Sequence, residues 1–195
     1  MKVIGLTGGI ASGKSTASAY LRELGAAIVD ADAISRASTR RGGAAFEAVC
    51  AAFGDILGAD GEIDRRKLGG IVFADEDARR KLNSIVHPAV MAESRAQIEN
   101  ARASGVKVCI LDVPLLFETG MEKLCDETWL IYVPREEQIR RMAERDGLDA
   151  AAAAARIDSQ MSLEEKLKRA DVAIDSSGTI EQTREKLRRL WEERT

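Results

Sequence analysis

The stretch Gly8-Gly9-Ile10-Ala11-Ser12-Gly13-Lys14-Ser15 decides the fold of this 195-residue chain, because its spacing is G-x-x-x-x-G-K-[ST]. It follows an apolar run at residues 2–6 (KVIGL) and precedes a helical pattern that starts near Gly13. Glycines let such a loop wrap around an anion with its N–H groups pointing inward, and the following helix adds the positive end of its dipole. The stretch therefore predicts a strand, a nucleotide-phosphate loop and a helix in direct succession.

The residues of this loop have expected contacts with a nucleotide. Lys14 is expected to reach the β- and γ-phosphates of ATP, and the Ser15 hydroxyl is expected to join the shell of a Mg²⁺ ion. ATP and Mg²⁺ are therefore the predicted cofactors. The positions expected to bind ATP are Gly9, Ile10, Ala11, Ser12, Gly13, Lys14, Ser15 and Thr16.

Further apolar runs along the chain predict an α/β fold, with a five-stranded parallel sheet flanked by helices. Runs that are apolar on both faces are typical of parallel strands that helices cover on either side. Strands are expected at residues 2–6, 26–30 (AAIVD), 106–112 (VKVCILD), 129–133 (WLIYV) and 172–175 (VAID).

Long helical segments separate these strands. Residues 33–104 contain no strand pattern of comparable quality and are interpreted as a helical insertion. A second helical stretch is expected from Glu136 to about Ala170, because it includes six consecutive alanines. An amphipathic helix at 179–194 closes the chain, and its expected apolar positions are Ile180, Leu187, Leu190 and Trp191. The expected breaks in the chain are the prolines Pro88, Pro114 and Pro134.

The composition argues against several other classes of protein. The 29 basic and 32 acidic residues give a net charge of −3, whereas a general nucleic-acid coat needs a broad basic surface. No apolar stretch approaches the roughly 18 residues of a membrane span, and MKVIGLTGGI lacks the pattern of a signal peptide. Cys50, Cys109 and Cys125 show no C-x-x-C spacing, which disfavours a disulfide framework or a zinc site. We therefore expect a cytoplasmic protein without a nucleic-acid, membrane or obligate protein partner.

Three acidic residues follow predicted strands and are candidates for the site. Asp112 ends the run 106–112 and is expected beside the phosphate loop, where it can hold Mg²⁺ or orient a substrate. Asp30 and Asp32 follow the run 26–30, and strand alternation would place them on the same side at the carboxyl edge of the sheet. A carboxylate there can accept the proton of an attacking hydroxyl. The alternative is a helix cap by Asp32 and a solvated Asp30.

Two arginines are candidates for contact with the phosphates. Arg141 and Arg145 are four residues apart and share one face of the predicted helix. Guanidiniums on one face can close over phosphates and neutralise charge during transfer. Glu136, Glu137 and Glu144 lie in the same stretch, so an ordinary salt-bridged surface is the competing interpretation.

His87 and two basic clusters each allow a structural and a functional interpretation. His87 is the only histidine, and a structural hydrogen-bonding role competes with a contact to substrate. The clusters at 65–67 (RRK) and 79–81 (RRK) are expected to be solvated helix faces, with contact to a phosphorylated substrate as the alternative.

Together these motifs resemble the dephospho-CoA kinase family over nearly the whole chain. The most distinctive segment is DVPLLFE at 112–118, which generic phosphate-loop proteins lack. Two positions depart from the family pattern, since Ala11 stands where Gly is usual and Ser176 where Asn is usual. The other similar segments are GLTGGIASGKST at 5–16, IVDADAISR at 28–36, VHP at 86–88, QIRRMAERDGL at 138–148, RIDSQ at 156–160 and EEKLKRADVAIDSSG at 164–178.

The resemblance implies an activity and its residues. The family uses ATP to phosphorylate the ribose 3′-hydroxyl of dephospho-CoA, which gives coenzyme A and ADP in the last step of coenzyme A synthesis. The small-molecule partner is then dephospho-CoA. The implied catalytic residues are Asp32, as the base, with Lys14, Arg141 and Arg145, and the implied substrate contacts are Asp30, Asp32, His87 and Asp112.

The resemblance also implies three parts of the chain. Residues 1–32, 105–135 and 168–195 would form the nucleotide-binding core, residues 33–104 a helical substrate domain and residues 136–167 a helical lid. Two other functions stay open from the residues alone: a kinase for another small molecule, such as a nucleoside monophosphate, and a regulatory ATPase. A guanine-nucleotide switch is disfavoured, because neither Asn83 nor Asn100 precedes a lysine as the N-K-x-D motif requires.

Overall fold

The computed structural model describes all residues from Met1 to Thr195, and they fall into two compact units. Met1–Val29 and Ile98–Thr195 form the first unit, which contains most of the sheet and is called here the α/β unit. Asp30–Gln97 form the second, which is called here the helical unit.

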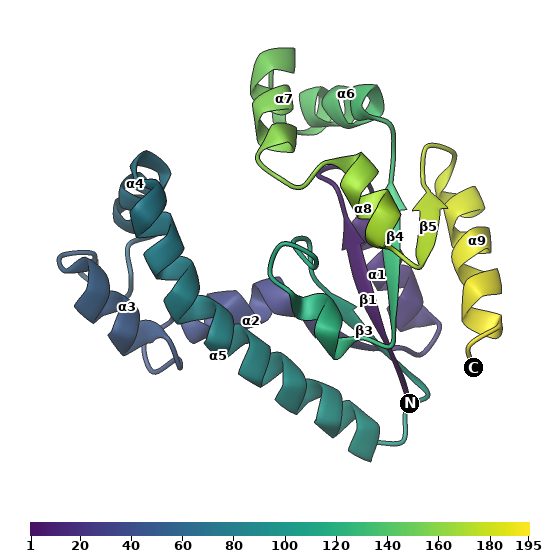
Figure 1. The fold of residues 1–195 in the computed structure, drawn as a ribbon, viewed down its shortest axis with the longest axis horizontal. Coiled ribbons are helices and arrows are strands. Elements are labelled where there is room, and N and C mark those ends of the chain that lie inside the picture. Colours follow the sequence, from purple (N-terminus) through teal and green to yellow (C-terminus); the bar gives the residue numbers. More distant parts are fainter. The chain divides into compact units, whose positions relative to one another are not determined.

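The sheet has five strands, as the sequence predicts, and their order in the sheet is β2-β3-β1-β4-β5. β1 lies at its centre and pairs in parallel with β3 and β4, and β4 pairs in parallel with β5 (Figure 1). Because the strands point the same way, their carboxyl ends meet at one edge, where ligands bind in open α/β sheets. The strands are β1 (Lys2–Gly8), β2 (Ala27–Asp30), β3 (Val108–Asp112), β4 (Glu127–Tyr132) and β5 (Val172–Asp175).

Several helices surround this sheet. The expected helical stretch from 136 to 170 is three helices rather than one. Gly147 ends α6 with a left-handed backbone (φ 66°), and the side chains of Asp149 and Ser162 cap α7 and α8. The helices of the α/β unit are α1 (Lys14–Glu23), the 3-10 helix η1 (Met121–Leu124), α6 (Arg135–Asp146), α7 (Ala150–Asp158), α8 (Leu163–Arg169) and α9 (Ile180–Glu192).

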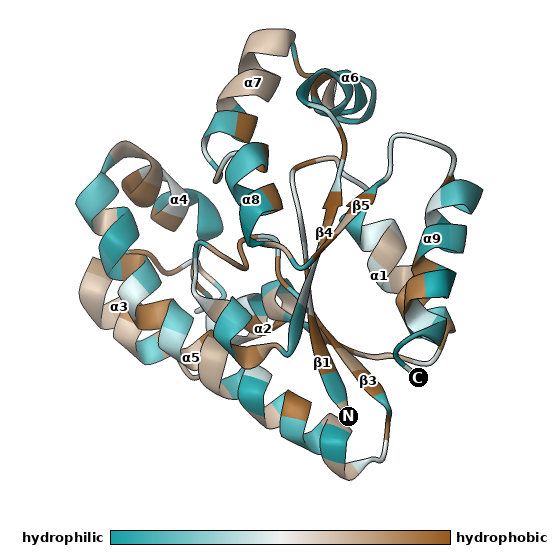
Figure 2. Ribbon diagram, turned by 45° about the vertical axis from the view of Figure 1, so that its right-hand side comes forward, coloured by the Kyte–Doolittle hydropathy of each residue, from teal (hydrophilic) through white to brown (hydrophobic).

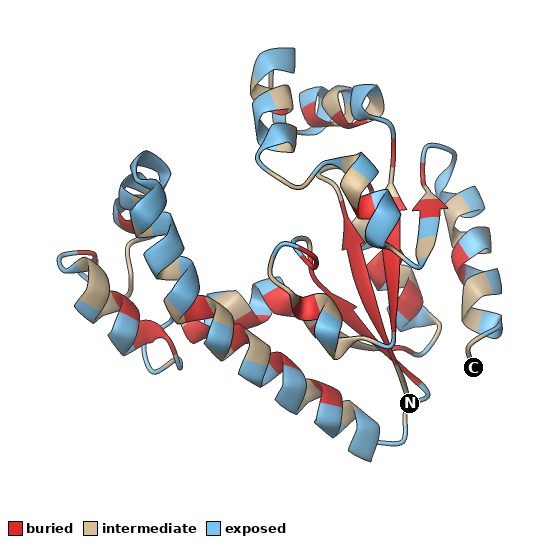
Figure 3. Ribbon diagram, in the orientation of Figure 1, coloured by how far each residue is buried: buried red, intermediate tan, exposed pale blue.

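The main hydrophobic core lies between the sheet and the pair α1 and α9, while α8 lies on the other side (Figure 2). The three central strands β1, β3 and β4 are almost wholly buried, whereas β2 and β5, at the two edges of the sheet, each have one buried residue (Figure 3). The expected apolar face of α9 is correct for Leu187, Leu190 and Trp191 but wrong for Ile180, which is 57% exposed at the first position of the helix. The core residues are Ile4, Leu6, Ala17, Leu21, Ala26, Val108, Ile110, Trp129, Ile131, Ile174 and Leu187.

The helical unit contains no named strand apart from the last residue of β2, in agreement with the sequence. Pro88 was expected to break the chain, but it lies inside α5. Pro88 and Ser84 are both exposed, so water can reach the Ser84 carbonyl that the proline leaves without a donor. None of the helices is at once long and apolar enough to cross a membrane. The helices here are α2 (Ala31–Ser38), α3 (Phe46–Phe53), α4 (Arg65–Ala74) and α5 (Glu76–Ala103), which continues into the α/β unit.

A buried cluster of charges ties the end of the chain to the sheet. Glu127, at the start of β4, accepts hydrogen bonds from Arg194 at 2.6 Å and from the Trp129 indole at 3.1 Å, and pairs with Lys2 at 2.5 Å. The Arg194 guanidinium also lies over the Trp129 ring, 5.2 Å from its centre. Mainly through the hydrogen bonds from Arg194, and also through Lys2, the pKa of Glu127 falls from 4.5 to about 2.

The variant Glu127→Gln is expected to be less stable than wild type by about 2–3 kcal/mol at pH 7, because it leaves Arg194 without its charged partner. The folded pKa of Glu127 lies below 4.5, so the carboxylate stabilises the fold fully above that pH and loses this effect as the pH falls toward 2. The difference in unfolding free energy between the two proteins should therefore shrink between pH 6 and pH 3 in urea titrations. Glu99→Gln, an exposed control, should show no such trend. A difference that is the same at both pH values contradicts the prediction.

Candidate active site

The phosphate loop lies where the sequence predicts it, between the end of β1 at Gly8 and the start of α1 at Lys14. The backbone of the loop leaves no room for a side chain at Gly8 and disfavours one at Gly13. A Cβ on Gly8 would lie 2.8 Å from the carbonyl oxygen of Ile131 and 2.5 Å from the Ser12 hydroxyl, and Gly13 has a left-handed backbone (φ 86°). The loop therefore passes close to the end of β4 before the chain enters the helix.

Three successive carbonyl groups of the loop are held by side chains from outside it. The Gln138 amide donates to the carbonyl of Ile10 at 2.7 Å, and the Ser176 hydroxyl donates to that of Ser12 at 2.5 Å. Arg141 makes a longer contact of 3.4 Å to the carbonyl of Ala11. In a trans peptide the N–H group points away from the carbonyl. Fixing these carbonyls outward thus turns the N–H groups that follow them toward the interior of the loop.

Within the loop, the remaining donors fit an anion. The Ser12 N–H bonds to the Gly9 carbonyl at 3.2 Å, but the Ser12 hydroxyl oxygen is buried with no hydrogen-bond partner. Helices also begin with N–H groups that have no partner inside the helix, and those of α1 start at Lys14. A bound phosphate group would satisfy such donors.

Lys14 and Asp112 form an ion pair, so the structure confirms that the acid at the end of β3 lies beside the loop. Asp112 is only 7% exposed, and its register is set by the pairing of β3 with β1, which puts it opposite Leu6. Lys14 holds one carboxylate oxygen of Asp112. The ammonium group is thereby positioned at the carboxyl edge of the sheet.

The residues at this edge fit a nucleotide-bound Mg²⁺ ion. No group of three or more His, Cys, Asp or Glu residues forms a metal cage anywhere in the chain. Mg²⁺ at nucleotide sites does not need one, because phosphate oxygens and water supply most of its ligands and the protein adds one or two oxygens. The hydroxyl of Ser15 and the carboxylate of Asp112 are oxygens of the required kind, on the first turn of α1 and at the end of β3.

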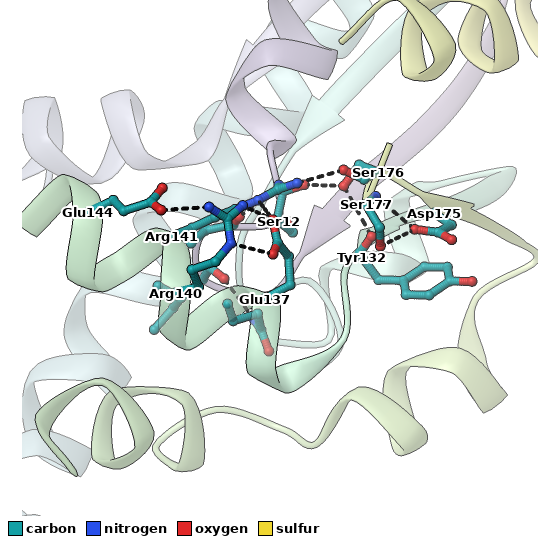
Figure 4. A network of polar contacts seen from close by, with 12 residues as sticks. Ser12, Tyr132, Glu137, Arg140, Arg141, Glu144, Asp175, Ser176 and Ser177 are labelled. Carbon is teal, nitrogen blue, oxygen red and sulfur yellow. Dashed lines mark hydrogen bonds and ion pairs between the residues drawn. The ribbon is translucent and has the colours of Figure 1, made fainter. Parts of the chain in front are cut away.

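Of the two candidate arginines on α6, only Arg141 lies against the loop. Its guanidinium donates to the Ser176 carbonyl at 2.8 Å and is held by Glu137 at 2.6 Å (Figure 4). The hydrogen bonds from Arg140 and Arg141 lower the pKa of Glu137 to about 2, so Glu137 is ionised at neutral pH. Arg145 instead forks onto Asp146 and is 61% exposed. The competing interpretation, a salt-bridged surface, describes Arg140 and Arg145 well.

Gln138 and Ser176 were not among the predicted ATP-binding or catalytic residues, yet both shape the loop. Gln138 is buried and precedes Arg141 by three residues on α6, so the two share a helix face. The backbone N–H of Ser176 donates to the Tyr132 carbonyl at 2.9 Å, which joins the ends of β4 and β5 to the loop. The only signal in the sequence for Gln138 is its spacing from Arg141.

The carboxylates after β2 are arranged differently from the prediction. β2 ends at Asp30 and α2 begins at Ala31, so Asp32 lies in a helical turn, and the strand alternation expected for Asp30 and Asp32 is wrong. The cap is Asp30, whose carboxylate accepts from the Ala33 N–H at 2.9 Å, and not Asp32. Asp32 lies in the first turn of α2, where the helix dipole favours an anion.

His87 lies on α5 in the helical unit and is half-buried. Its ring makes no hydrogen bond within that unit, and it lines a cavity there. Burial lowers the pKa of His87 below 6.5, so the imidazole is neutral at pH 7.

Replacing Ala11 by Gly is expected to stabilise the protein by about 1 kcal/mol, because Ala11 has a left-handed backbone (φ 59°) that disfavours a side chain. Thermal unfolding without nucleotide measures the effect. Ala11 is the only non-glycine residue with positive φ. Ala17→Gly serves as the control, because Ala17 lies inside α1, where glycine destabilises the helix and should lower the melting temperature. A lower melting temperature for Ala11→Gly would contradict the assigned strain.

Comparison with known proteins identifies the family of this chain. The family model for dephospho-CoA kinase matches residues 2–182. A dephospho-CoA kinase of Carboxydothermus hydrogenoformans is 53% identical over 188 residues, which cover 96% of this chain and 91% of that protein. The solved structure of TT1252 from Thermus thermophilus has a TM-score of 0.84 at 34% identity and covers 100% of this chain and 98% of that one. The solved structure of dephospho-CoA kinase from Campylobacter jejuni has a TM-score of 0.68 at 28% identity. It covers 100% of this chain and 97% of that one. With its phosphate loop, its acid at the end of β3 and this likeness along nearly its whole length, the chain belongs to the dephospho-CoA kinase family.

Proposed function

We propose that this protein is a cytoplasmic kinase that transfers the γ-phosphoryl group of ATP to the ribose 3′-hydroxyl of dephospho-CoA, giving coenzyme A and ADP. The observation that carries the proposal is the Lys14–Asp112 pair beside the phosphate loop, in a chain 53% identical to a dephospho-CoA kinase. Within this proposal, residues 33–104 bind the acceptor and residues 136–167 close over the nucleotide.

In the proposed reaction, the α/β unit binds the phosphates of ATP. The N–H groups of the loop and the ammonium of Lys14 offset negative charge on the β- and γ-phosphates, which is the main contribution that a protein makes to phosphoryl transfer. Arg141 lies against the same loop and adds a third source of positive charge. Arg145 would reach the phosphates only after leaving Asp146.

The metal would be held by the Ser15 hydroxyl and the Asp112 carboxylate. When bound, Mg²⁺ supplies charge neutralisation between the β- and γ-phosphates. Lys14 occupies one oxygen of Asp112, so this lysine also orients the carboxylate for its ligand.

The acceptor reacts through its 3′-oxygen, which forms a bond to the γ-phosphorus while the bond from that phosphorus to the bridging oxygen of ADP breaks. The proton of the hydroxyl passes to the Asp32 carboxylate in this proposal. The position of Asp32 supports the role, because its side chain is exposed in the first turn of α2, where the hydroxyl of a bound acceptor can reach it.

The experiment that tests the function measures ADP release by the purified protein with Mg-ATP and one acceptor at a time. Dephospho-CoA should stimulate release strongly, with coenzyme A detected by its mass, whereas AMP, UMP and adenosine should not. Stimulation by a nucleotide alone would assign the chain to a different acceptor. Tight ATP binding with no stimulation by any acceptor would favour a regulatory ATPase.

Two variants should separate phosphate stabilisation from proton transfer. Lys14→Ala is expected to reduce kcat by about 10²-fold or more, because it removes a cation that binds the transferred group.

Asp32→Asn should bind ATP with wild-type affinity but lose most of its transfer rate, because the amide cannot accept the proton. Lys123→Ala and Asp55→Asn, at exposed positions, are the matched controls and should turn over normally. Normal kcat in either test variant would remove that residue from the mechanism.

A further inference from the structure

Glu137 on α6 is an acid that has no role in the proposed reaction, although it contacts two arginines. Its carboxylate accepts from the Arg141 Nε–H at 2.6 Å and from Arg140 through two hydrogen bonds of 2.6 and 2.8 Å (Figure 4). Arg141 follows Glu137 by four residues, so the two side chains meet on one face of the helix. Because its pKa lies at about 2, Glu137 is a charged acceptor at neutral pH.

The Arg141 guanidinium is bonded at each of its three nitrogens. Glu137 takes the Nε–H, the Ser176 carbonyl accepts at 2.8 Å from one terminal nitrogen, and the Ala11 carbonyl accepts at 3.4 Å from the other. These contacts fix the plane of the group. A guanidinium has five N–H groups, so two of them stay free for a ligand at the phosphate loop. Two N–H groups are what a guanidinium uses to bind a phosphate.

Among these three acceptors, only Glu137 is charged. Charge-assisted hydrogen bonds are roughly twice as strong as neutral ones, and the contact to Ala11 is also long. Arg145, one turn further along α6, shows the effect of a different acid, because Asp146 binds its guanidinium with two hydrogen bonds of 2.8 Å. On this helix the acidic partner therefore determines where each guanidinium lies.

The helix itself is held at the loop without Glu137. Gln138 is buried and donates to the Ile10 carbonyl at 2.7 Å, and Met142 is fully buried in the same helix. The Glu137 side chain is partly exposed, and ion pairs near the surface add little to the stability of a protein. Removal of the Glu137 carboxylate is thus expected to free the Arg141 guanidinium and to leave α6 in place.

We propose that Glu137 is a positioning residue for phosphoryl transfer, whose carboxylate holds the Arg141 guanidinium against the phosphate loop with two N–H groups free for the phosphates of ATP. The inference rests on the proposed function and extends it to a residue that binds neither ATP nor the acceptor. A guanidinium that is already fixed loses less conformational entropy when the phosphates bind.

The negative charge of Glu137 has an opposite effect, because it reduces the attraction between this cluster and a phosphate. Salt screens that charge at the partly exposed surface, whereas the loss of alignment is not screened. The proposal therefore predicts that removal of Glu137 weakens the use of ATP, and charge neutralisation alone predicts that removal strengthens it.

Steady-state kinetics of Glu137→Ala and Glu144→Ala separate these two effects. Glu144 lies on the same helix and pairs with Arg140 at 2.6 Å, so both variants remove one negative charge but only the first removes a partner of Arg141. Glu137→Ala is expected to lower kcat/KM for ATP about tenfold, because the guanidinium is no longer aligned, and Glu144→Ala should keep the wild-type value. Glu137→Asp should recover part of the loss, because a shorter carboxylate can still pair four residues away.

A second readout is independent of activity and follows the Arg141 Nε–H in ¹H–¹⁵N spectra. An Nε–H held by a carboxylate exchanges slowly with water, so its signal should be present in wild type and in Glu144→Ala and absent in Glu137→Ala. Arg141→Ala lacks this group and assigns the signal. Melting temperatures close to wild type should show that the variants are folded.

Two results would overturn the positioning role. One is a folded Glu137→Ala protein that keeps the wild-type kcat/KM or uses ATP better. The other is an Arg141→Ala protein with normal kcat/KM, because Arg141 would then take no part in the reaction. In both cases the function stands as long as wild type phosphorylates dephospho-CoA. If wild type does not phosphorylate it, the proposed function itself fails.

Discussion

The α/β unit depends on the parallel pairing of β1 with β3 on one side and with β4 on the other. In this register Leu6 lies opposite Asp112, and Gly8 lies opposite Ile131. A shift of β3 by one residue would turn Asp112 to the opposite face of the sheet, away from Lys14. The buried apolar side chains of all three strands fix the register, so the hydrophobic core sets the position of the charged pair.

The two units present chemically different surfaces. The α/β unit presents backbone N–H groups and a lysine whose position is fixed by a buried acid, which is a rigid arrangement suited to phosphates that must be aligned for transfer. The helical unit has exposed arginine side chains around a cavity of its own.

The sequence predicts this fold well because its signals are local. Apolar runs mark the five strands, and the glycine spacing places the loop between β1 and α1. Asp112 is also predictable, since an acid that ends a strand parallel to β1 has to lie near the loop. Local patterns fail where a short-range hydrogen bond determines where a strand ends and a helix begins. The Asp30 side chain caps α2, so the helix begins directly after the last residue of β2.

The outer contacts of the loop could not be predicted, because they join residues far apart in the sequence. Gln138 and Ser176 bond to Ile10 and Ser12 across 128 and 164 positions. Neither residue type is unusual at the end of a strand or on a helix, so only the folded arrangement gives them a role. Pro88 illustrates the opposite case: its local signal is strong, but exposure to water lets the helix continue.

The carbonyl bonds from Gln138 and Ser176 have a consequence for how the protein responds to a nucleotide. A peptide whose carbonyl accepts a hydrogen bond becomes more polarised, and its N–H becomes a stronger donor. A phosphate that binds these N–H groups strengthens the outer bonds in turn, and this effect is mutual because the two events share one free energy. Nucleotide binding at the loop therefore also stabilises α6 and the segment after β5, which carry Gln138 and Ser176. The backbone amides of these two segments would exchange more slowly with solvent deuterium when nucleotide is bound.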